Sequence, residues 1–363
     1  TDYKIVLAGQ TNLKISNQNA YFNGSDFAVY DMAGGGGLNG YVRGINYGVD
    51  AGTATSAGGS VFSATTAQQI TGSITNLPTT SLALGTLNGS LKIVGASNVT
   101  MVAGNTLTIN GRDNNGVSGL LKTGGGTSVL SGGTALTVKG DIINNSATAQ
   151  VISMNLAFGG SSSGVINTAA GNITISGGLS GSGALTKEGS GSLTLSGASK
   201  TNTGPLTINA GNVTINGASL NTNITVNSGA TLIAGTNYMI CQGGGILTIN
   251  GGTFKAGNAA TYIDGGLVLN NATITNTGGS GTYISSRGLW TANGNNTINM
   301  NISTETNNAN GSNFNIQSGT TTINNSIYNY AGWYQGLTKN GTGTLVLNGA
   351  NSYNGTTNLR AGT

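Results

Sequence analysis

The sequence contains one thirteen-residue pattern twice. The copies begin at Leu185 and Leu337 and read LTKEGSGSLTLSG and LTKNGTGTLVLNG. Eight of the paired positions are identical, and two more exchange Ser and Thr. A chain that repeats itself is usually built by stacking similar units. The repetition therefore predicts a repeat architecture rather than an ordinary globular domain.

The composition indicates a β-structure with a buried core and a nearly uncharged surface. Gly accounts for 64 of the 363 residues, charged residues for 6% and hydrophobic residues for 37%. This hydrophobic fraction is too high for a disordered linker. Asn, Thr and Ser suit the outside of a sheet, and Gly suits its turns. The 13 basic residues are scattered along the chain, so we expect no nucleic-acid partner.

Short alternating segments such as 173–175, 193–195 and 213–215 indicate strands with one apolar face. The apolar pairs in these segments start 20 residues apart, and Leu247 and Leu267 repeat the step. The spacing predicts an all-β fold, a right-handed parallel β-helix with coils of about 20 residues. Stacked Asn or Thr at the turns would form hydrogen-bonded ladders. An antiparallel sandwich is the alternative, but it does not explain the equal steps.

The regularity of the pattern divides the chain in two. Residues 1–90 carry Gly-rich interruptions at 33–38 and 51–59, and we expect them to form an irregular N-terminal cap or decorated coils. Residues 91–363 are expected to form the repetitive β-helix. The second copy stops where the first continues into the strand at 213–215. We therefore expect the β-helix to continue beyond the end of the chain.

The second copy resembles the autotransporter-associated β-strand repeat. The residues that carry the resemblance are Leu337, Lys339, Gly341, Gly343, Thr344, Leu345, Leu347, Gly349, Asn351, Tyr353, Gly355, Ala361, Gly362 and Thr363. The copy from Leu185 has Ser199 and Thr201 where the pattern has Asn and Tyr, and a degenerate third copy runs over 120–132. The resemblance implies a secreted bacterial β-helix, such as an autotransporter passenger or the stalk of a large surface protein.

Parallel β-helices also include polysaccharide lyases and hydrolases, but the residues of this chain do not favour an enzyme. The chain has no His, which excludes a Ser-His-Asp or Cys-His relay. Its nine acids form no Asp-rich motif, and Asp26 and Asp31 suit turn or surface roles. Cys241 stands alone and is interpreted as a small buried residue. We therefore expect no catalytic residue, metal site or cofactor, and no apolar run that could span a membrane.

Aromatic residues concentrate late in the chain. They are Tyr283, Trp290, Tyr328, Tyr330, Trp333 and Tyr334. Exposed aromatic side chains stack on sugars or anchor a partner, so these six are candidate ligand or partner contacts. The alternative is that they pack over a coil or cover an end of the β-helix.

Together these patterns favour a structural role. The hypothesis is a secreted fibre or stalk protein at a bacterial cell surface or in the extracellular space. Open β-helix ends would allow such chains to associate end to end. Two alternatives stay open: an adhesin that binds glycans or a host surface through its aromatic residues, and a carbohydrate-active β-helix enzyme whose site the sequence does not reveal.

Overall fold

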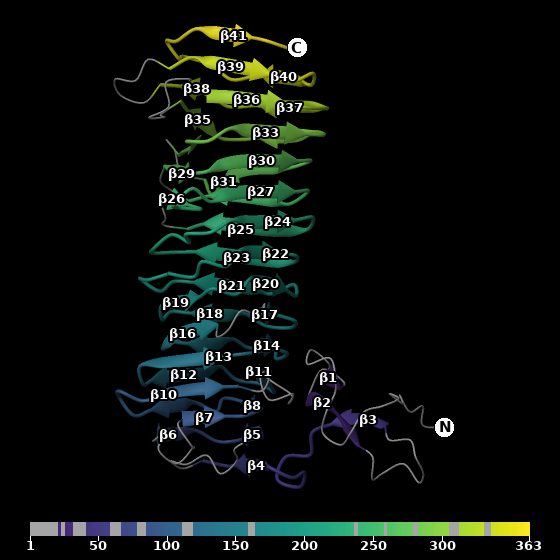
Figure 1. Ribbon diagram of the computed structural model, residues 1–363, viewed down its shortest axis with the longest axis vertical. Coiled ribbons are helices and arrows are strands. Elements are labelled where there is room, and N and C mark those ends of the chain that lie inside the picture. Colours follow the sequence, from purple (N-terminus) through teal and green to yellow (C-terminus); the bar gives the residue numbers. More distant parts are fainter. Residues whose placement is uncertain are drawn as a thin grey trace. The chain divides into compact units, whose positions relative to one another are not determined.

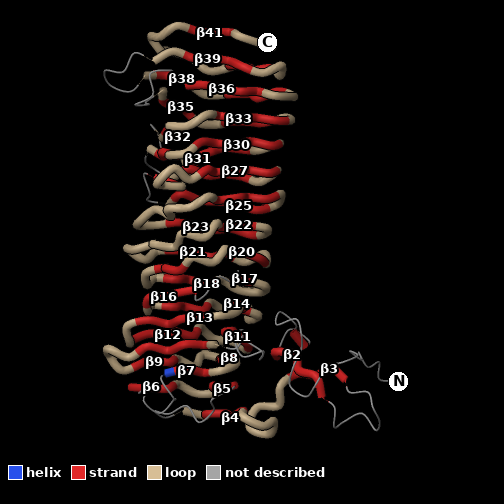
Figure 2. The backbone as a smooth tube through the Cα atoms, viewed as in Figure 1, coloured by secondary structure: helices blue, strands red, loops and turns tan. Residues whose placement is uncertain are grey.

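The computed structural model describes residues 21–22, 26–31, 41–58, 67–77, 85–110, 119–158, 164–235, 239–257, 260–278, 282–304, 312–329 and 335–363. These residues form strands and turns, and none of them lies in an α-helix (Figures 1 and 2). The all-β prediction is confirmed. The chain divides into two compact units, Thr1–Gly183 and Ala184–Thr363, which are described in turn.

The first described residues of the first unit form a small antiparallel sheet. Its strands, in sheet order, are β1 (Tyr21–Phe22), β2 (Asp26–Asp31) and β3 (Tyr41–Gly44). β2 pairs with both neighbours in antiparallel register. This sheet lies within the segment expected to be a cap or decorated coils.

The rest of the first unit winds into coils, and each full coil gives one strand to each of three parallel sheets. The first sheet contains β4 (Thr53–Ser56), β5 (Ala67–Ile70), β8 (Ser90–Val94), β11 (Gly119–Thr123), β14 (Asp141–Asn144) and β17 (Gly164–Asn167). The second contains β6 (Ile74–Leu77), β9 (Val99–Met101), β12 (Ser128–Gly132), β15 (Gln150–Ile152) and β18 (Ile173–Ile175). The third contains β7 (Thr86–Leu87), β10 (Thr106–Ile109), β13 (Ala135–Val138), β16 (Asn155–Phe158) and β19 (Leu179–Gly181).

The second unit has the same parallel plan. Its first sheet contains β20 (Leu185–Glu188), β22 (Leu206–Ile208), β24 (Ile224–Asn227), β27 (Ile246–Asn250), β30 (Gly266–Asn270), β33 (Trp290–Asn293), β36 (Ser312–Ile316), β39 (Leu337–Asn340) and β41 (Thr357–Leu359). Its second contains β21 (Ser192–Leu195), β23 (Gly211–Ile215), β25 (Ala230–Ala234), β28 (Thr253–Ala256), β31 (Thr273–Asn276), β34 (Asn296–Ile298), β37 (Thr320–Ile323) and β40 (Thr344–Leu347). A shorter third sheet contains β26 (Met239–Ile240), β29 (Thr261–Ile263), β32 (Tyr283–Ser286), β35 (Asn301–Ser303) and β38 (Ile327–Tyr328).

The alternation of apolar and polar residues places the core inside the coils. In the second sheet of the second unit, Leu193, Val213, Leu232, Phe254 and Ile274 pair in one continuous column. Each is at most 1% exposed. Because successive strand residues point to opposite faces, the intervening Thr and Asn residues face outward. The predicted stacking of like residues is therefore confirmed.

Coil length is less uniform than the sequence steps suggest. Successive coils are spaced by about 22 residues, compared with the expected 20. Paired residues lie 18 apart from Leu206 to Ile224 and 24 apart from Trp290 to Phe314. The strands keep register while the turns absorb the difference, because turns tolerate insertions that a ladder does not.

An asparagine ladder lies on the first sheet of the second unit. It runs through Asn209, Asn227, Asn250, Asn270 and Asn293, with each Nδ2 donating to the Oδ1 of the preceding Asn over 2.7 to 3.3 Å. Asn209 Nδ2 in turn donates to Glu188 Oε1 over 2.6 Å. The predicted ladder is present, and it links outward side chains of successive coils.

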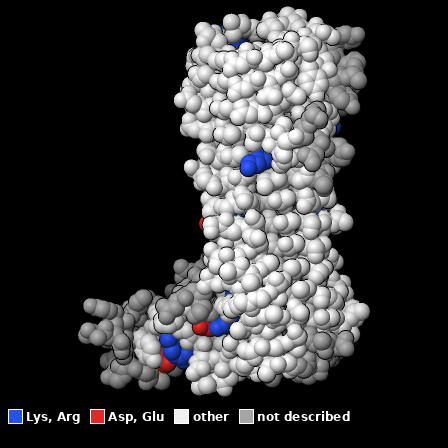
Figure 3. Space-filling model, turned by 180° about the vertical axis from the view of Figure 1, so that it is seen from behind, with Lys and Arg blue, Asp and Glu red and all other residues white. Residues whose placement is uncertain are grey.

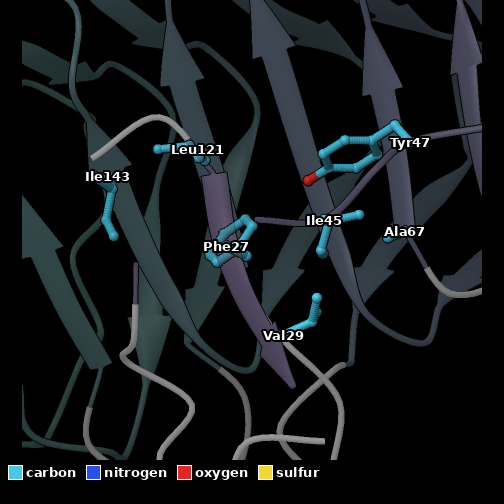
Figure 4. Packing of buried hydrophobic residues seen from close by; sticks show 7 residues of the cluster. All are labelled: Phe27, Val29, Ile45, Tyr47, Ala67, Leu121 and Ile143. Carbon is cyan, nitrogen blue, oxygen red and sulfur yellow. The ribbon is translucent and has the colours of Figure 1, made fainter. Parts of the chain in front are cut away.

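The N-terminal antiparallel sheet packs against the outer face of the first parallel sheet. The outward column beneath it reads Gln69, Lys92, Leu121, Ile143 and Asn167. Leu121 and Ile143 are buried, in one cluster with Phe27 and Val29 of β2 and with Ile45, Tyr47 and Ala67 (Figure 4). Lys92 Nζ contacts the Asp26 carboxylate and lies 5.6 Å from the centre of the Tyr47 ring. The sequence becomes apolar on the outside of these two coils because β2 covers them.

Replacing Leu121 by Thr should weaken this packing while leaving the coils folded. The change should cost about 2 kcal/mol, since it shortens one side chain of an apolar contact. Limited proteolysis should then cleave within residues 21–50 sooner than in the unmodified protein. Val151→Thr is the matched control, because Val151 is an outward, half-buried residue outside the cluster. Equal cleavage rates in the two variants would contradict the packing described here.

Candidate functional site: repeat turns and a tyrosine strip

The repeated motif folds into a strand, a glycine turn and a second strand, with a lysine buried at the turn. Lys187 has no exposed side-chain surface. Its Nζ donates to the main-chain oxygens of Glu188, Gly189 and Ala210 over 2.7 to 2.9 Å. Ala210 belongs to the next coil, after β22. The ammonium therefore joins its own turn to the neighbouring coil.

The second copy repeats this arrangement. Lys339 Nζ donates to the main-chain oxygens of Asn340, Gly341 and Ala361 over 2.7 to 3.1 Å. Gly189 and Gly341, two residues after each lysine, have φ of 78° and 77°, a conformation that favours glycine. The lysine and the glycine therefore have the same structural roles in both copies of the repeat.

Two further lysines are bound in the same way. Lys122 Nζ donates to the main-chain oxygens of Gly95, Thr123 and Gly124 over 2.7 to 3.2 Å. Lys200 Nζ donates to those of Gly197, Asn216 and Ala218 over 2.5 to 2.9 Å. Lys122 lies in the degenerate copy expected at 120–132. Its turn resembles those of the two clear copies, because it has a buried lysine and a glycine, Gly124, with a positive φ of 72°.

Burial lowers the pKa of these lysines, to about 8 for Lys187 and about 8 for Lys200. The pKa of Lys122 and that of Lys339 are lowered by the same cause. Removing an ammonium from water disfavours its charged form. The three carbonyl oxygens compensate for lost hydration, but the charge remains costly.

These pKa values predict that stability rises with pH above neutrality. An unfolded lysine titrates near 10.5. Between about pH 8 and that value the unfolded chain holds protons that the folded chain has released, so raising the pH favours the folded chain. The urea midpoint of the unmodified protein should therefore rise from about pH 8 to about pH 9.5, relative to the double variant Lys187→Met/Lys200→Met. Parallel pH profiles of the two proteins would show that these lysines do not titrate as described.

The predicted aromatic contacts fall into three groups. Trp290 is 2% exposed and packs at 5.0 Å between ring centres against Phe314, so it belongs to the core of its coil. Tyr283 is 5% exposed, and Tyr328 is half-buried. Tyr330, Trp333 and Tyr334 lie outside the described residues. Their role as ligand contacts stays a prediction.

Tyr283 and Tyr328 belong to a tyrosine strip that also contains Tyr262. Tyr262 and Tyr283 meet edge to face at 5.9 Å, and Tyr283 and Tyr328 at 5.8 Å. The hydroxyls of Tyr262 and Tyr283 are 2.6 Å apart. The strip follows the third sheet across β29, β32 and β38. Tyr262 is not among the contacts predicted from the sequence, although its distance of 21 residues from Tyr283 equals about one coil.

Charged side chains are sparse on the face in Figure 3. In the N-terminal segment Arg43 pairs with Asp31 and Asp50 over 2.7 and 2.6 Å. Asp26 and Asp31 therefore each pair with a cation. Cys241 is buried, and burial raises the pKa of its thiol to about 12. Within the part of the chain described, no helix has the length and apolar character needed to cross a membrane.

Comparison with known proteins identifies the repeat. The model of the passenger-associated-transport-repeat matches residues 185–215 and 337–363. Searches of curated proteins and of solved structures give no match. Both matched segments begin at a buried lysine turn and include the facing turn of the next coil. The chain is thus a parallel β-solenoid that carries two passenger-associated transport repeats and is similar to the passengers of autotransporters.

Proposed function

We propose that this chain is a structural, non-catalytic part of a secreted or cell-surface bacterial protein, which it extends by stacking coils. The observation that carries the proposal is the coincidence of both passenger repeats with complete lysine turns. A repeat that mainly joins one coil to the next builds length rather than an active site. The sparse charge on the face in Figure 3 accords with a neutral scaffold.

Antibody labelling of the source bacterium tests the location. Intact cells should bind an antibody raised against residues 185–363 as strongly as permeabilised cells do, and extracellular protease should remove the signal. A cytoplasmic protein labelled in parallel controls for lysis. Labelling that requires permeabilisation would contradict the proposal.

End-to-end self-association is the mode of assembly that we propose. In a parallel solenoid each coil pairs with the strand edges of its neighbour, and a coil of a second copy would pair with such an edge in the same way. Light scattering should show a mass that rises with protein concentration. A constant monomer mass would contradict this mode.

Glycan binding by the tyrosine strip is the second candidate. It is favoured because the strip places three rings in sequence on one sheet, and aromatic rings with polar hydroxyls suit sugar rings. Tyr262→Ala and Tyr328→Ala should lose binding to a glycan array, whereas Tyr353→Ala, whose hydroxyl contacts Thr357, should keep it. Unchanged binding in the first two variants would remove the strip from the site.

A further inference from the structure

Four lysine ammonium groups have the same kind of hydrogen-bond partners. Each Nζ donates to three main-chain carbonyl oxygens, and these oxygens come from two neighbouring coils in every case. The four residues are Lys122, Lys187, Lys200 and Lys339, and each is at most 4% exposed. We call each set of three oxygens a carbonyl cradle. Its three acceptors match the three donors of an ammonium group.

The shape of the cradle comes from the backbone as well as from the lysine. At Lys187 it requires two coils to approach closely, since a Cβ added to Gly211 would lie 2.4 Å from the oxygen of Gly191. At Lys339 a Cβ added to Gly362 would lie 2.4 Å from the oxygen of Gly343. Glycine at these positions lets the carbonyl groups of both coils converge. Converging main-chain carbonyls replace the hydration shell of a monovalent cation.

We infer that each carbonyl cradle is a binding site for a primary ammonium ion, which the chain fills with its own lysine, and that the filled cradle fixes which coils are neighbours. This role goes beyond projection at a cell surface. In the column that follows Lys187, the next two residues are Ile208 and Val226. A slip by one coil would place such an apolar side chain at the cradle and leave the oxygens without a donor. The lysine thereby disfavours the wrong register of the coils. A variant without the lysine should be less stable, because the carbonyl oxygens then lack a donor.

Chemical rescue tests the site. Lys187→Ala keeps the β-carbon and removes three carbons and the nitrogen, which are the heavy atoms of n-propylammonium. Adding n-propylammonium should raise the urea midpoint of Lys187→Ala and recover at least half of its loss relative to the unmodified protein. Tetramethylammonium at the same ionic strength should not raise the midpoint, because it has no N–H donor. Lys255→Ala is the matched control, since Lys255 faces outward on β28 and is half-buried.

Lys200→Ala provides a second, independent cradle and should show the same rescue if Lys187→Ala does not fold. The inference is supported if n-propylammonium raises the urea midpoint of either cradle variant. Neither n-propylammonium with Lys255→Ala nor tetramethylammonium with the cradle variants should then raise the midpoint. Equal responses to both salts, or no response in a folded variant, would overturn the inference. The urea midpoint does not depend on where the protein is located in the cell. If n-propylammonium gave no rescue, the proposed function would therefore be unaffected.

Discussion

Replacing Trp290 by Ala should lower the free energy of unfolding by about 3 to 5 kcal/mol. The side chain is 2% exposed, stacks on Leu267 and Phe314 in adjacent coils and is tilted by 47° to the Phe314 ring. Removing it opens a cavity that the paired strands cannot close, because the ladder holds them at a fixed spacing. Urea unfolding monitored by circular dichroism measures the change.

Thr291→Ala is the control for this prediction. Thr291 follows Trp290 on the same strand but faces outward, so its replacement should change the free energy of unfolding by no more than about 0.5 kcal/mol. A similar small effect for both variants would mean that Trp290 does not fill the core. It would then return to the set of candidate ligand contacts.

Replacing Lys187 by Met should destabilise the fold by about 3 kcal/mol, although Met is close to lysine in volume. Three main-chain oxygens lose their ammonium donor, and a buried acceptor without a partner costs about 1 to 3 kcal/mol. Relief of the burial cost of the charge offsets part of this loss. Urea unfolding at about pH 7 measures the change.

Lys255→Met serves as the comparison, because it removes the same atoms from an outward, half-buried position. Its effect should stay within about 0.5 kcal/mol. Lys339→Met should resemble Lys187→Met, since its ammonium has equivalent partners in the second copy. If Lys187→Met were as stable as Lys255→Met, the cradle would contribute nothing to stability.

The stacked coils could be predicted from the sequence because their cause is periodic. Leu193 and Val213 recur at one coil's distance, and the strand that contains each has one apolar face. The asparagine ladder follows from the same regularity. The variable coil length could not be predicted, since the extra residues lie in turns, where the ladder imposes no period.

The packing of β2 on the outside of the solenoid also escaped prediction. Leu121 and Ile143 read as ordinary members of apolar segments, and only the pairing register shows that they point outward. The sequence left two alternatives for Trp290, a ligand contact or packing over a coil, and could not decide between them because its partner Phe314 lies one coil away. Both the covering of Leu121 and Ile143 and the burial of Trp290 depend on contacts between residues far apart in the sequence, which the local sequence does not reveal.

The sequence shows that the lysine belongs to the repeated motif, but it does not show that the ammonium joins two coils by hydrogen bonds. A lysine in a polar, glycine-rich turn suggests a solvated side chain. The fold buries it because the facing coil supplies a third carbonyl, from Ala210 or Ala361. A buried charge in a chain with only 6% charged residues is the signal that could have drawn attention to it.

The central claim is that the repeats of the second unit stack as parallel coils in register, and pairs of spin labels test it most directly. Thr186, Thr207, Thr225, Thr248, Val268 and Thr291 form one outward column. Labelled cysteines at Thr186 and Thr291 should lie about 24 Å apart and those at Thr207 and Thr291 about 19 Å apart, at about 4.8 Å per coil. The buried Cys241 should stay unlabelled. Narrow distance distributions whose centres differ by about 4.8 Å, one coil step, would support parallel stacking in register. Distance distributions that are broad, or that have equal centres for the two pairs, would contradict it.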